Sequence, residues 1–383
     1  MLFSIFRSFF TLGWISFGGP AAHIGYFRRE FVEVKAWITD KQYADLVGLS
    51  QFLPGPGSSQ VGFGIGYIRG GVLGGISAFL GFTLPSILLM LLFATVSSHF
   101  LDSTVLIGLL SGLKLLAVIV VADATWGMFR SFCQSNVTKV LFVFSAVITL
   151  TLPSTAMQIF AMLGCAIVSI MLTKAENTTT SWTTVFSKIA YTPLILFLTI
   201  LLGVIMLDSN RHEFIVFKPF FETGTLVFGG GHVVLPLLES SLENQISPDI
   251  FLSGYAMAQA VPGPMFTLAT YLGYFLLPSN PIIGALLATL AIFIPGFLLL
   301  LTMLKNWQEI ALIPWVSGAM SGINAAVVGF LLATLYDPVI TSSVKGTSEI
   351  ALVVIGFILM RKMKLPILIT VLFFALSGVL FLK

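Results

Sequence analysis

The chain has 383 residues, of which 57% are apolar and 9% are charged, with a net charge of +3 and a mean hydropathy of +1.02. A soluble domain carries roughly 25% charged residues, so this composition excludes a water-soluble globular protein. The small net charge gives no sign of a nucleic-acid partner. We expect the chain to face lipid.

Apolar segments follow one another along most of the chain. An α-helix needs roughly 20 apolar residues to cross the hydrocarbon core, and several segments reach that length. Alternation of apolar and polar residues with a period of two, which is typical of a membrane β-barrel, is absent. We therefore predict an all-α, polytopic helical membrane protein. Its apolar helices are expected over 72–97, 104–127, 139–152, 154–173, 190–207, 284–304, 315–335, 350–360 and 365–382.

The sequence is a tandem duplication, because five segments recur in the same order at offsets of 208 to 213 residues. We predict a first repeat over 1–175, a linker with an extra apolar segment over 176–209, and a second repeat over 210–383. The apolar N-terminus is similar to a signal peptide, but Arg7 interrupts it and part of it recurs later, so we expect it to be structural. The matched segments are 9–20 with 220–231, 51–57 with 259–265, 74–89 with 284–299, 111–114 with 321–324, and Pro153 with Pro366.

The first feature of each repeat is a glycine cluster, FGGP at 17–20 and FGGGH at 228–232. Clustered glycines let a backbone approach a ligand closely, although they also permit a kink or a tight helix crossing. Because the clusters recur, we favour a ligand site. His23 and His232 closely follow them and are candidates for contact with a ligand or a proton. The cluster residues predicted to bind are Gly18, Gly19, Gly229, Gly230 and Gly231.

The loops that follow these clusters differ in charge. Residues 23–42 contain four Lys or Arg, and their counterpart at 237–250 contains none. The last hairpin reverses this contrast, because 150–154 is uncharged while 361–366 contains three basic residues beginning with Arg361. Cytoplasmic loops collect Lys and Arg. We therefore predict two repeats of inverted topology, as in many secondary transporters.

Each repeat is then broken by prolines and glycines, in LPGPG at 53–57 and VPGPM at 261–265. Proline blocks helix continuation, and the freed backbone groups are tolerated at membrane depth only where protein or a water-filled cavity satisfies them. We expect two re-entrant hairpins whose tips approach the midplane from opposite faces. The tip residues predicted to bind are Pro54, Gly55, Pro56, Pro262, Gly263 and Pro264.

A helix restarts after each break. Ser58, Ser59 and Gln60 follow the first break with hydroxyls suited to an N-cap, and Thr267 is the hydroxyl that follows the second. The free N–H groups and the dipole of a helix start favour an anion. We include these four residues in the predicted site.

A row of glycines, Gly62, Gly66, Gly70 and Gly74, comes next. A spacing of four residues places them on one helix face, which predicts a packing surface. No G-x-x-x-x-G-K-[ST] motif occurs, so the sequence gives no sign of a nucleotide-hydrolysing site.

Few ionisable residues lie within the apolar runs. Lys114 is a functional candidate because a charge at that depth is costly, although a structural pairing is the alternative. Asp123 lies on the opposite face of the same helix. Glu222 replaces Thr11 of the first repeat, and either acid is a candidate for proton coupling, while Glu222 is also a candidate partner of Lys114.

A count of charges indicates the class of ligand. Two helix starts at about +0.5 each, together with Lys114, supply on the order of +2, which a dianion balances. Cation transport is disfavoured because the broken segments have no acidic cluster. Cys133 and Cys165 have no metal-ligand spacing, so we expect no metal and no cofactor.

The parity of the membrane crossings is an open point. With about five crossings per repeat, inversion requires that 190–207 does not cross, although it is about long enough to do so. Six crossings per repeat would place the basic residues of 361–366 outside, against the charge rule. We favour a segment that lies along the interface or dips in and returns, and leave the number of helices open.

The motifs FGGPAAHIGYFRRE, LPGPGSSQVGFGIGY, GFTLPSILLM, FGGGHVVLPLLE and AQAVPGPMFTLATYLGY resemble the chromate ion transporter family in its long, two-domain form. The resemblance covers nearly the whole chain. It implies an inner-membrane carrier that exports chromate, with sulfate as a competing or alternative substrate. The second copy lacks the GSSQ tail of the first, so the two repeats need not contribute equally to the site.

The predicted function is a secondary transporter that exports chromate, or a related divalent oxyanion such as sulfate, by alternating access. An importer of sulfate or another oxyanion and an anion channel are the alternatives. A membrane enzyme is disfavoured, because no nucleophile–base constellation or metal-ligand cluster occurs. The oxyanion preference, the coupling ion and the oligomeric state, a homodimer included, stay open.

Overall fold

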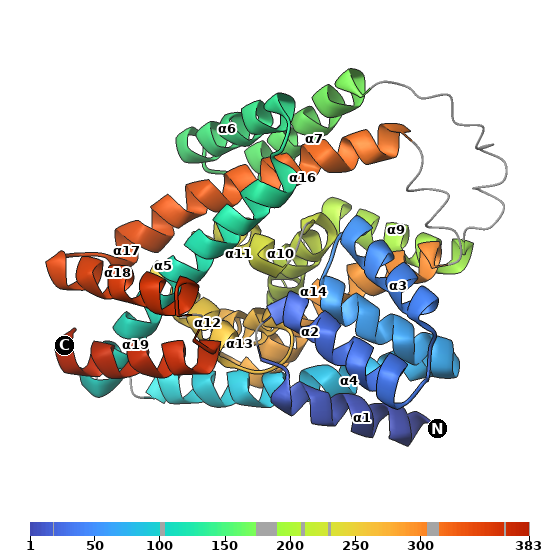
Figure 1. Cartoon of the computed structure of the whole chain (residues 1–383), viewed down its shortest axis with the longest axis horizontal. Coiled ribbons are helices and arrows are strands. Elements are labelled where there is room, and N and C mark those ends of the chain that lie inside the picture. The colour runs from blue at the N-terminus through green and yellow to red at the C-terminus, as the bar shows by residue number, and fades with distance from the viewer. Residues whose placement is uncertain are drawn as a thin grey trace.

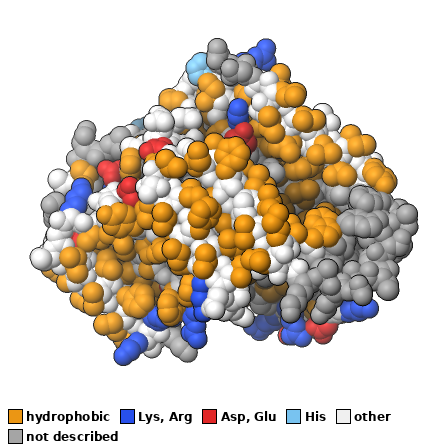
Figure 2. Space-filling model, turned by 90° about the horizontal axis from the view of Figure 1, so that it is seen from above, with side chains coloured by type: hydrophobic (Ala, Val, Ile, Leu, Met, Phe, Trp, Pro, Cys, Tyr) orange, Lys and Arg blue, Asp and Glu red, His pale blue; other side chains and the backbone are white. Residues whose placement is uncertain are grey.

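The computed structural model describes residues 1–17, 19–99, 104–173, 190–207, 211–228, 231–304, 314–363 and 365–382. These residues form helices and turns and no strand, which confirms the predicted all-α class. Hydrophobic side chains cover much of the face shown in Figure 2, and charged ones are few. Five of the described helices are long and apolar enough to cross a membrane, namely α4 (Gly57–His99), α5 (Thr104–Phe132), α7 (Thr155–Leu172), α14 (Pro281–Met303) and α16 (Pro314–Thr334).

Each apolar run predicted from the sequence coincides with a helix. Several helices begin where a hydroxyl caps the first turn, as Ser135 and Ser154 do by accepting the amides of Thr138 and Met157. The other elements before residue 174 are α1 (Leu2–Ile15), α2 (Gly19–Phe27), the π-helix η1 (Arg28–Val34), α3 (Asp40–Phe52) and α6 (Asn136–Thr151). Those after residue 189 are α9 (Tyr191–Met206), α10 (His212–Leu226), η2 (Gly231–Val233), α11 (Val234–Leu242), α12 (Pro248–Ala260), η3 (Met265–Thr267), α13 (Leu268–Leu276), η4 (Leu335–Ile340), α17 (Thr341–Ser343), α18 (Thr347–Arg361) and α19 (Ile367–Phe381).

Helix α4 consists of two arms that fold back on each other. The turn between them is at Gly70 and Gly71, and Gly71 has a φ of 63°, which glycine adopts without strain. Gly66 in the first arm packs directly against the backbone of Gly74 in the second. The expected row of four glycines on one helix face is therefore wrong: Gly70 belongs to a turn, and Gly66 and Gly74 face each other across a crossing. Figure 1 shows this hairpin along the lower edge of the view, beside α1.

The second part of the chain repeats this crossing. Helices α13 and α14 approach so closely that Gly273 and Gly284 contact each other's backbone. Gly284 is the duplicate of Gly74 at an offset of 210 residues. The contacts of α1 with α4 recur as contacts of α10 with α14.

The two parts of the chain are interleaved. Helix α16 packs against α6 and α7, and α5 packs against α18 and α19, so a long helix from one part supports the last two helices of the other (Figure 1). Aromatic rings join the parts at the centre, where Phe63 stacks on Phe297 with ring centroids 4.6 Å apart. Helix α9 packs on α14 and α10, and the amide of Ala190 donates to Thr302 O at 3.3 Å.

Candidate functional site

Two Pro-Gly-Pro turns, which we call elbow 1 (Pro54–Pro56) and elbow 2 (Pro262–Pro264), exchange hydrogen bonds between the two parts of the chain. Gly55 donates its amide to the carbonyl oxygen of Val227 at 2.7 Å, and Gly263 donates to that of Ser16 at 2.9 Å. Ser16 and Val227 are duplicates at an offset of 211 residues, and each precedes a glycine cluster. Each elbow is therefore bound to the glycine segment of the other part.

Each elbow also rests against the proline-containing helix of the other part. A Cβ on Gly55 would lie 2.9 Å from Gly296 Cα, and one on Gly263 would overlap Ser86 Oγ. Both glycines have positive φ angles, 115° and 99°, which disfavour a side chain independently of the space. Gly296 and Ser86 directly follow the helix prolines and are duplicates of each other. This close packing explains why glycine stands at both elbows.

Polar side chains fasten the elbows. The buried amide of Gln60 donates to Pro54 O and to Gly296 O, both at 2.9 Å, and so joins elbow 1 to α14. The hydroxyl of Ser86 donates to Pro262 O at 2.7 Å and joins elbow 2 to α4. Gln60, which the sequence assigned to binding, thus uses its amide group for support.

A histidine connects the two elbows. His23 Nε2 donates to Ser16 O at 3.2 Å, the same oxygen that accepts the amide of Gly263. In the neutral ring Nδ1 then accepts from Ser58 Oγ, which lies 3.2 Å away at the start of α4. His23 is fully buried. A continuous path of hydrogen bonds therefore runs from the helix after elbow 1 to elbow 2.

The hydroxyls after the elbows do not cap helices, contrary to the prediction. Ser58 bonds His23, and Thr267 donates to Pro264 O at 2.7 Å. Ser59 Oγ and Gln60 Oε1 are buried, and neither has a hydrogen-bond partner among the described residues. Buried polar atoms are normally satisfied, so these two acceptors mark a polar spot without a partner beside elbow 1.

A cavity of about 250 Å³ lies beside elbow 2. It brings together four residues that the sequence singled out: Gly19, Asp123, His232 and Gly263. The remaining described lining residues are Val120, Ala124, Ala258, Gln259, Val261, Met265, Met360 and Leu365. The two glycine clusters meet nearby, because a Cβ on Gly231 would lie 3.5 Å from Pro20.

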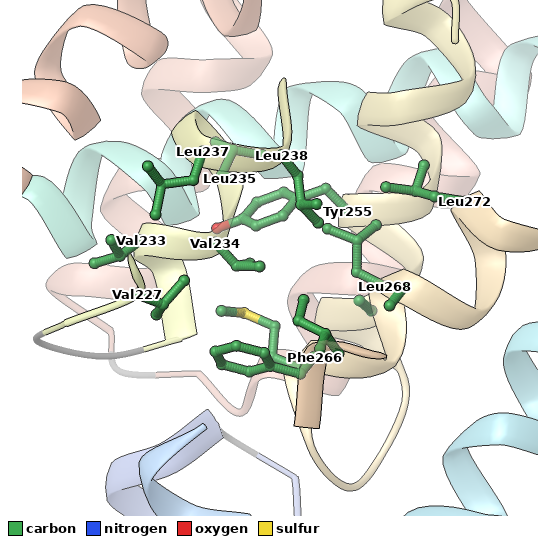
Figure 3. Close-up of a cluster of buried hydrophobic side chains, with 14 of the residues drawn as sticks. Val227, Val233, Val234, Leu235, Leu237, Leu238, Tyr255, Phe266, Leu268 and Leu272 are labelled. Carbon is green, nitrogen blue, oxygen red and sulfur yellow. The ribbon is translucent and has the colours of Figure 1, made fainter. Parts of the chain in front are cut away.

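The sequence reasoning missed one polar group in the cavity lining and one that contacts the lining. Gln259 lines it, and Tyr255 positions its histidine, since the phenol oxygen lies 3.0 Å from His232 Nδ1. Figure 3 shows the ring of Tyr255 extending from α12 toward the segment that begins at Val233, among buried apolar side chains. Gln259 belongs to the duplicated motif that contains elbow 2, so its position in the repeat was the available signal. Nothing in the local sequence pointed to Tyr255.

Other predicted site residues lie elsewhere. Lys114 is not among the lining residues, and its Nζ lies 2.5 Å from Asp249 Oδ1 at the start of α12. Glu222, the other candidate partner of Lys114, lines a separate cavity of about 250 Å³ together with Lys218. Elbow 1 and its following residues do not line the cavity at elbow 2. Gly18, Gly229 and Gly230 lie outside the described residues.

The pairing of Lys114 changes the charge count that favoured a dianion. Its ammonium is neutralised by Asp249, so it adds no net charge to a shared pocket. Among the described residues, no group of three or more His, Cys, Asp or Glu is arranged to hold a metal ion.

The chain matches the sequence profile of the family described as Chromate transporter over residues 3–170 and 214–379. The chain belongs to this family. A chromate transport protein of Pseudomonas aeruginosa is 26% identical over 351 residues, covering 87% of this chain and 80% of that protein. A chromate transport protein of Cupriavidus metallidurans is 26% identical over 370 residues, covering 94% and 89%. An uncharacterised transporter of Methanocaldococcus jannaschii is 25% identical over 342 residues, covering 86% and 82%.

Membership of the chromate transporter family, together with the apolar helices, identifies a multi-pass membrane protein that transports ions and is not an enzyme. No solved structure matches the chain. The two matched regions contain both elbows and both glycine clusters, and the segment between them contains α9.

Proposed function

We propose that this protein is a secondary transporter that exports chromate, or a related divalent oxyanion such as sulfate, across the inner membrane by alternating access. The observation that carries the proposal is the reciprocal bonding of the elbows, Gly55 to Val227 and Gly263 to Ser16. Each interrupted segment is bound to the glycine segment of the other part, and these two contacts can be exchanged as one repeat moves against the other.

The groups around elbow 2 suit an oxyanion. His232 and the amide of Gln259 are side chains able to donate hydrogen bonds, and Gly19, where an added Cβ would meet no atom within 4 Å, leaves room for a ligand to approach the backbone. The cavity of about 250 Å³ has space for a small inorganic ion with some water. At elbow 1 the unpartnered hydroxyl of Ser59 supplies a second donor for an oxyanion. We propose that the ion passes between these two places.

The membrane potential favours the outward direction. Moving two negative charges outward through about 100 mV, interior negative, gains roughly 4.6 kcal/mol, at about 2.3 kcal/mol per charge. Export of a dianion therefore needs no coupled proton, whereas accumulation inside would need one. Proton exchange through Asp123 or Glu222 stays part of the hypothesis.

Purified protein in proteoliposomes tests the function. We expect saturable uptake of radiolabelled chromate and sulfate, with mutual competition and weaker inhibition by molybdate and phosphate. Transport of a dianion without a compensating ion generates a current, and its sign separates export from import. Flux that fails to saturate and shows no exchange would indicate a channel, and the absence of any oxyanion flux would refute the proposal.

A further inference from the structure

The cavity at elbow 2 has an acidic residue in its lining and a basic residue beside it. Asp123 of α5 lines the cavity, as does Met360, which precedes Arg361 at the end of α18. Arg361 Nη1 donates to Asp123 Oδ1 at 3.1 Å. Among the described lining residues there is no Lys or Arg, so Arg361 is the cation that this ion pair brings to the cavity wall.

Aromatic rings hold the arginine at this position. The guanidinium carbon of Arg361 lies 6.0 Å from the ring centre of Trp126 and 5.7 Å from that of Phe357. Trp126 is three residues after Asp123 on α5, and Phe357 is one turn before Arg361 on α18. Contacts of a cation with aromatic faces are favourable and only weakly directional. The guanidinium can therefore change its hydrogen-bond partner without leaving these rings.

We infer that Arg361 is the residue that recruits the oxyanion to this cavity. Asp123 accepts the hydrogen bond of the guanidinium until the oxyanion takes the place of the carboxylate. This inference deepens the proposed function and rests on it. The planar guanidinium offers paired donors that match two oxygens of a tetrahedral oxyanion as well as they match a carboxylate. A dianion carries more charge than Asp123 and competes for the same donors.

The exposure of the pair makes such an exchange feasible. The side chains of Arg361 and Asp123 are 36% and 46% exposed, and exposed ion pairs contribute little to stability. Opening the pair therefore costs little, and the released carboxylate stays in the lining of the cavity. Without Arg361, the uncompensated carboxylate of Asp123 would repel an anion that enters the cavity.

The duplication does not explain the pair. At the observed offsets of 210 and 213 residues, the counterparts of Asp123 and Arg361 are Ala333 and Ile148. The interleaved packing of α5 against α18 recurs as α16 against α6, so the same packing forms at the second place without these two charges. A brace needed by the fold would be expected in both copies, and the charges occur in one.

Chromate and sulfate uptake by the full chain in proteoliposomes tests the inference. We expect Arg361→Gln to raise the KM at least about tenfold with little change in maximal rate, since a hydrogen bond to a charged group is worth that much in binding. Asp123→Asn, which frees the guanidinium, should lower the KM or leave it unchanged. In Arg361→Gln/Asp123→Asn the KM should fall below that of Arg361→Gln alone, because the repelling carboxylate is gone.

If the ion pair only stabilises the fold, the KM values of the two variants should change differently from this expectation, because Arg361→Gln and Asp123→Asn would then impair the protein alike. Equal KM increases in Arg361→Gln and Asp123→Asn, or a wild-type KM in Arg361→Gln, overturn the inference while leaving the proposed function intact. Arg69→Gln is the matched control, because Arg69 also contacts an indole, that of Trp37 at 5.6 Å, whereas neither Arg69 nor Trp37 lines the cavity as Asp123, the partner of Arg361, does. Should Arg361→Gln fail to fold, Arg361→Lys, which keeps the charge but loses the paired donors, is expected to raise the KM. Absence of flux in the wild-type protein refutes function and inference together.

Discussion

His23 donates a hydrogen bond to the carbonyl oxygen of Ser16 at 3.2 Å, and that oxygen also accepts the amide of Gly263 at 2.9 Å. The other ring nitrogen of His23 lies 3.2 Å from Ser58 Oγ at the start of α4. One imidazole thus links the helix that follows elbow 1 with elbow 2. The histidine that follows the other glycine cluster does something else, because His232 bonds Tyr255 and lines the cavity.

Replacing His23 tests this link. His23→Leu removes both hydrogen bonds and leaves the Ser58 hydroxyl buried without its partner, so we expect a loss of about 1–3 kcal/mol of stability and a lower maximal transport rate. His23→Gln, which keeps a donor and an acceptor, should recover part of both. Thermal unfolding in detergent and vesicle transport measure the two effects. A His23→Leu protein with wild-type stability would show that the link contributes nothing.

The conformation of elbow 2 predicts a severe effect of a single methyl group. Gly263→Ala forces a side chain into a φ of 99°, at a cost of about 1–2 kcal/mol, and drives its Cβ into Ser86 Oγ. We expect a lower melting temperature and the loss of most transport activity. Gly164→Ala is the control, because Gly164 lies on α7 with no atom within 4 Å of the added Cβ.

The two costs at Gly263 can be separated. Ser86→Ala removes the overlapping hydroxyl, so Gly263→Ala/Ser86→Ala should recover the part of the loss that is due to overlap and keep the part due to backbone strain. If Gly263→Ala behaved like Gly164→Ala, the backbone geometry described for elbow 2 would be wrong.

The contact of Tyr255 with His232 predicts that removing the Tyr255 hydroxyl changes the affinity for oxyanion rather than the fold. Tyr255→Phe removes the hydroxyl that orients His232 and keeps the apolar packing of the ring shown in Figure 3, so we expect a KM for oxyanion up to about fivefold higher. Tyr271→Phe is a matched control, because Tyr271 is equally buried and bonds Ser97 away from the cavity. Equal effects of the two substitutions on KM would contradict a role for Tyr255 in the site.

The ion pair of Lys114 with Asp249 predicts a measurable coupling. The side chain of Lys114 is 12% exposed, so Asp249→Asn leaves a largely buried ammonium without its partner, and we expect a loss of about 1–3 kcal/mol. Lys114→Met should cost a similar amount, and the double variant less than the sum, because the two substitutions remove the same interaction. The free energies of unfolding in detergent of the wild type, the two single variants and the double variant complete this double-mutant cycle. Additive losses would show that the pair contributes no stability.

The same variants address the predicted role of Lys114 in binding. Asp249 does not line the cavity, so Asp249→Asn should leave the KM for oxyanion unchanged. A changed KM in Lys114→Met, at a temperature where both variants are folded, would support the original prediction that this lysine contacts the ion.

The helices and the elbows were predictable because their signals are local. Apolar runs locate the helices, and closely spaced prolines and glycines interrupt them, so the breaks at Pro54 and Pro262 could be read directly. The duplication added that the two breaks are counterparts of each other. The hairpin inside α4 was missed because a spacing of four residues is compatible with one continuous helix face, whereas the positive φ of Gly71 reverses the chain.

The partners of the charged residues could not be predicted. Two ion pairs form between helices that are far apart in the sequence and that the interleaved packing brings together. They are Lys114 with Asp249 and Asp123 with Arg361. Periodicity assigns a side chain to a helix face but says nothing about the helix that covers that face. Arg361 was therefore assigned a role in topology alone, although the structure brings it next to a cavity.

Inverted topology predicts that equivalent loops react from opposite sides of the membrane. Lys41 and Glu243 lie exposed in the two loops that differ in charge, and the native Cys133 and Cys165 are 2% and 0% exposed, so their background labelling should be low. With a membrane-impermeant maleimide, we expect Lys41→Cys to react only in inside-out vesicles and Glu243→Cys only in intact cells. The parent protein without either substitution is the control.

The length of α9 is the physical reason to expect this outcome. Its 16 residues rise about 24 Å at 1.5 Å per residue, which is less than the roughly 30 Å of the hydrocarbon core. If α9 lies along α14 without crossing the membrane, the second repeat starts on the side where the first ended. With an odd number of crossings in each repeat, the second copy is then inverted. Labelling of both cysteines from the same side would mean that α9 crosses the membrane despite its length, and the two elbows would then enter from one face.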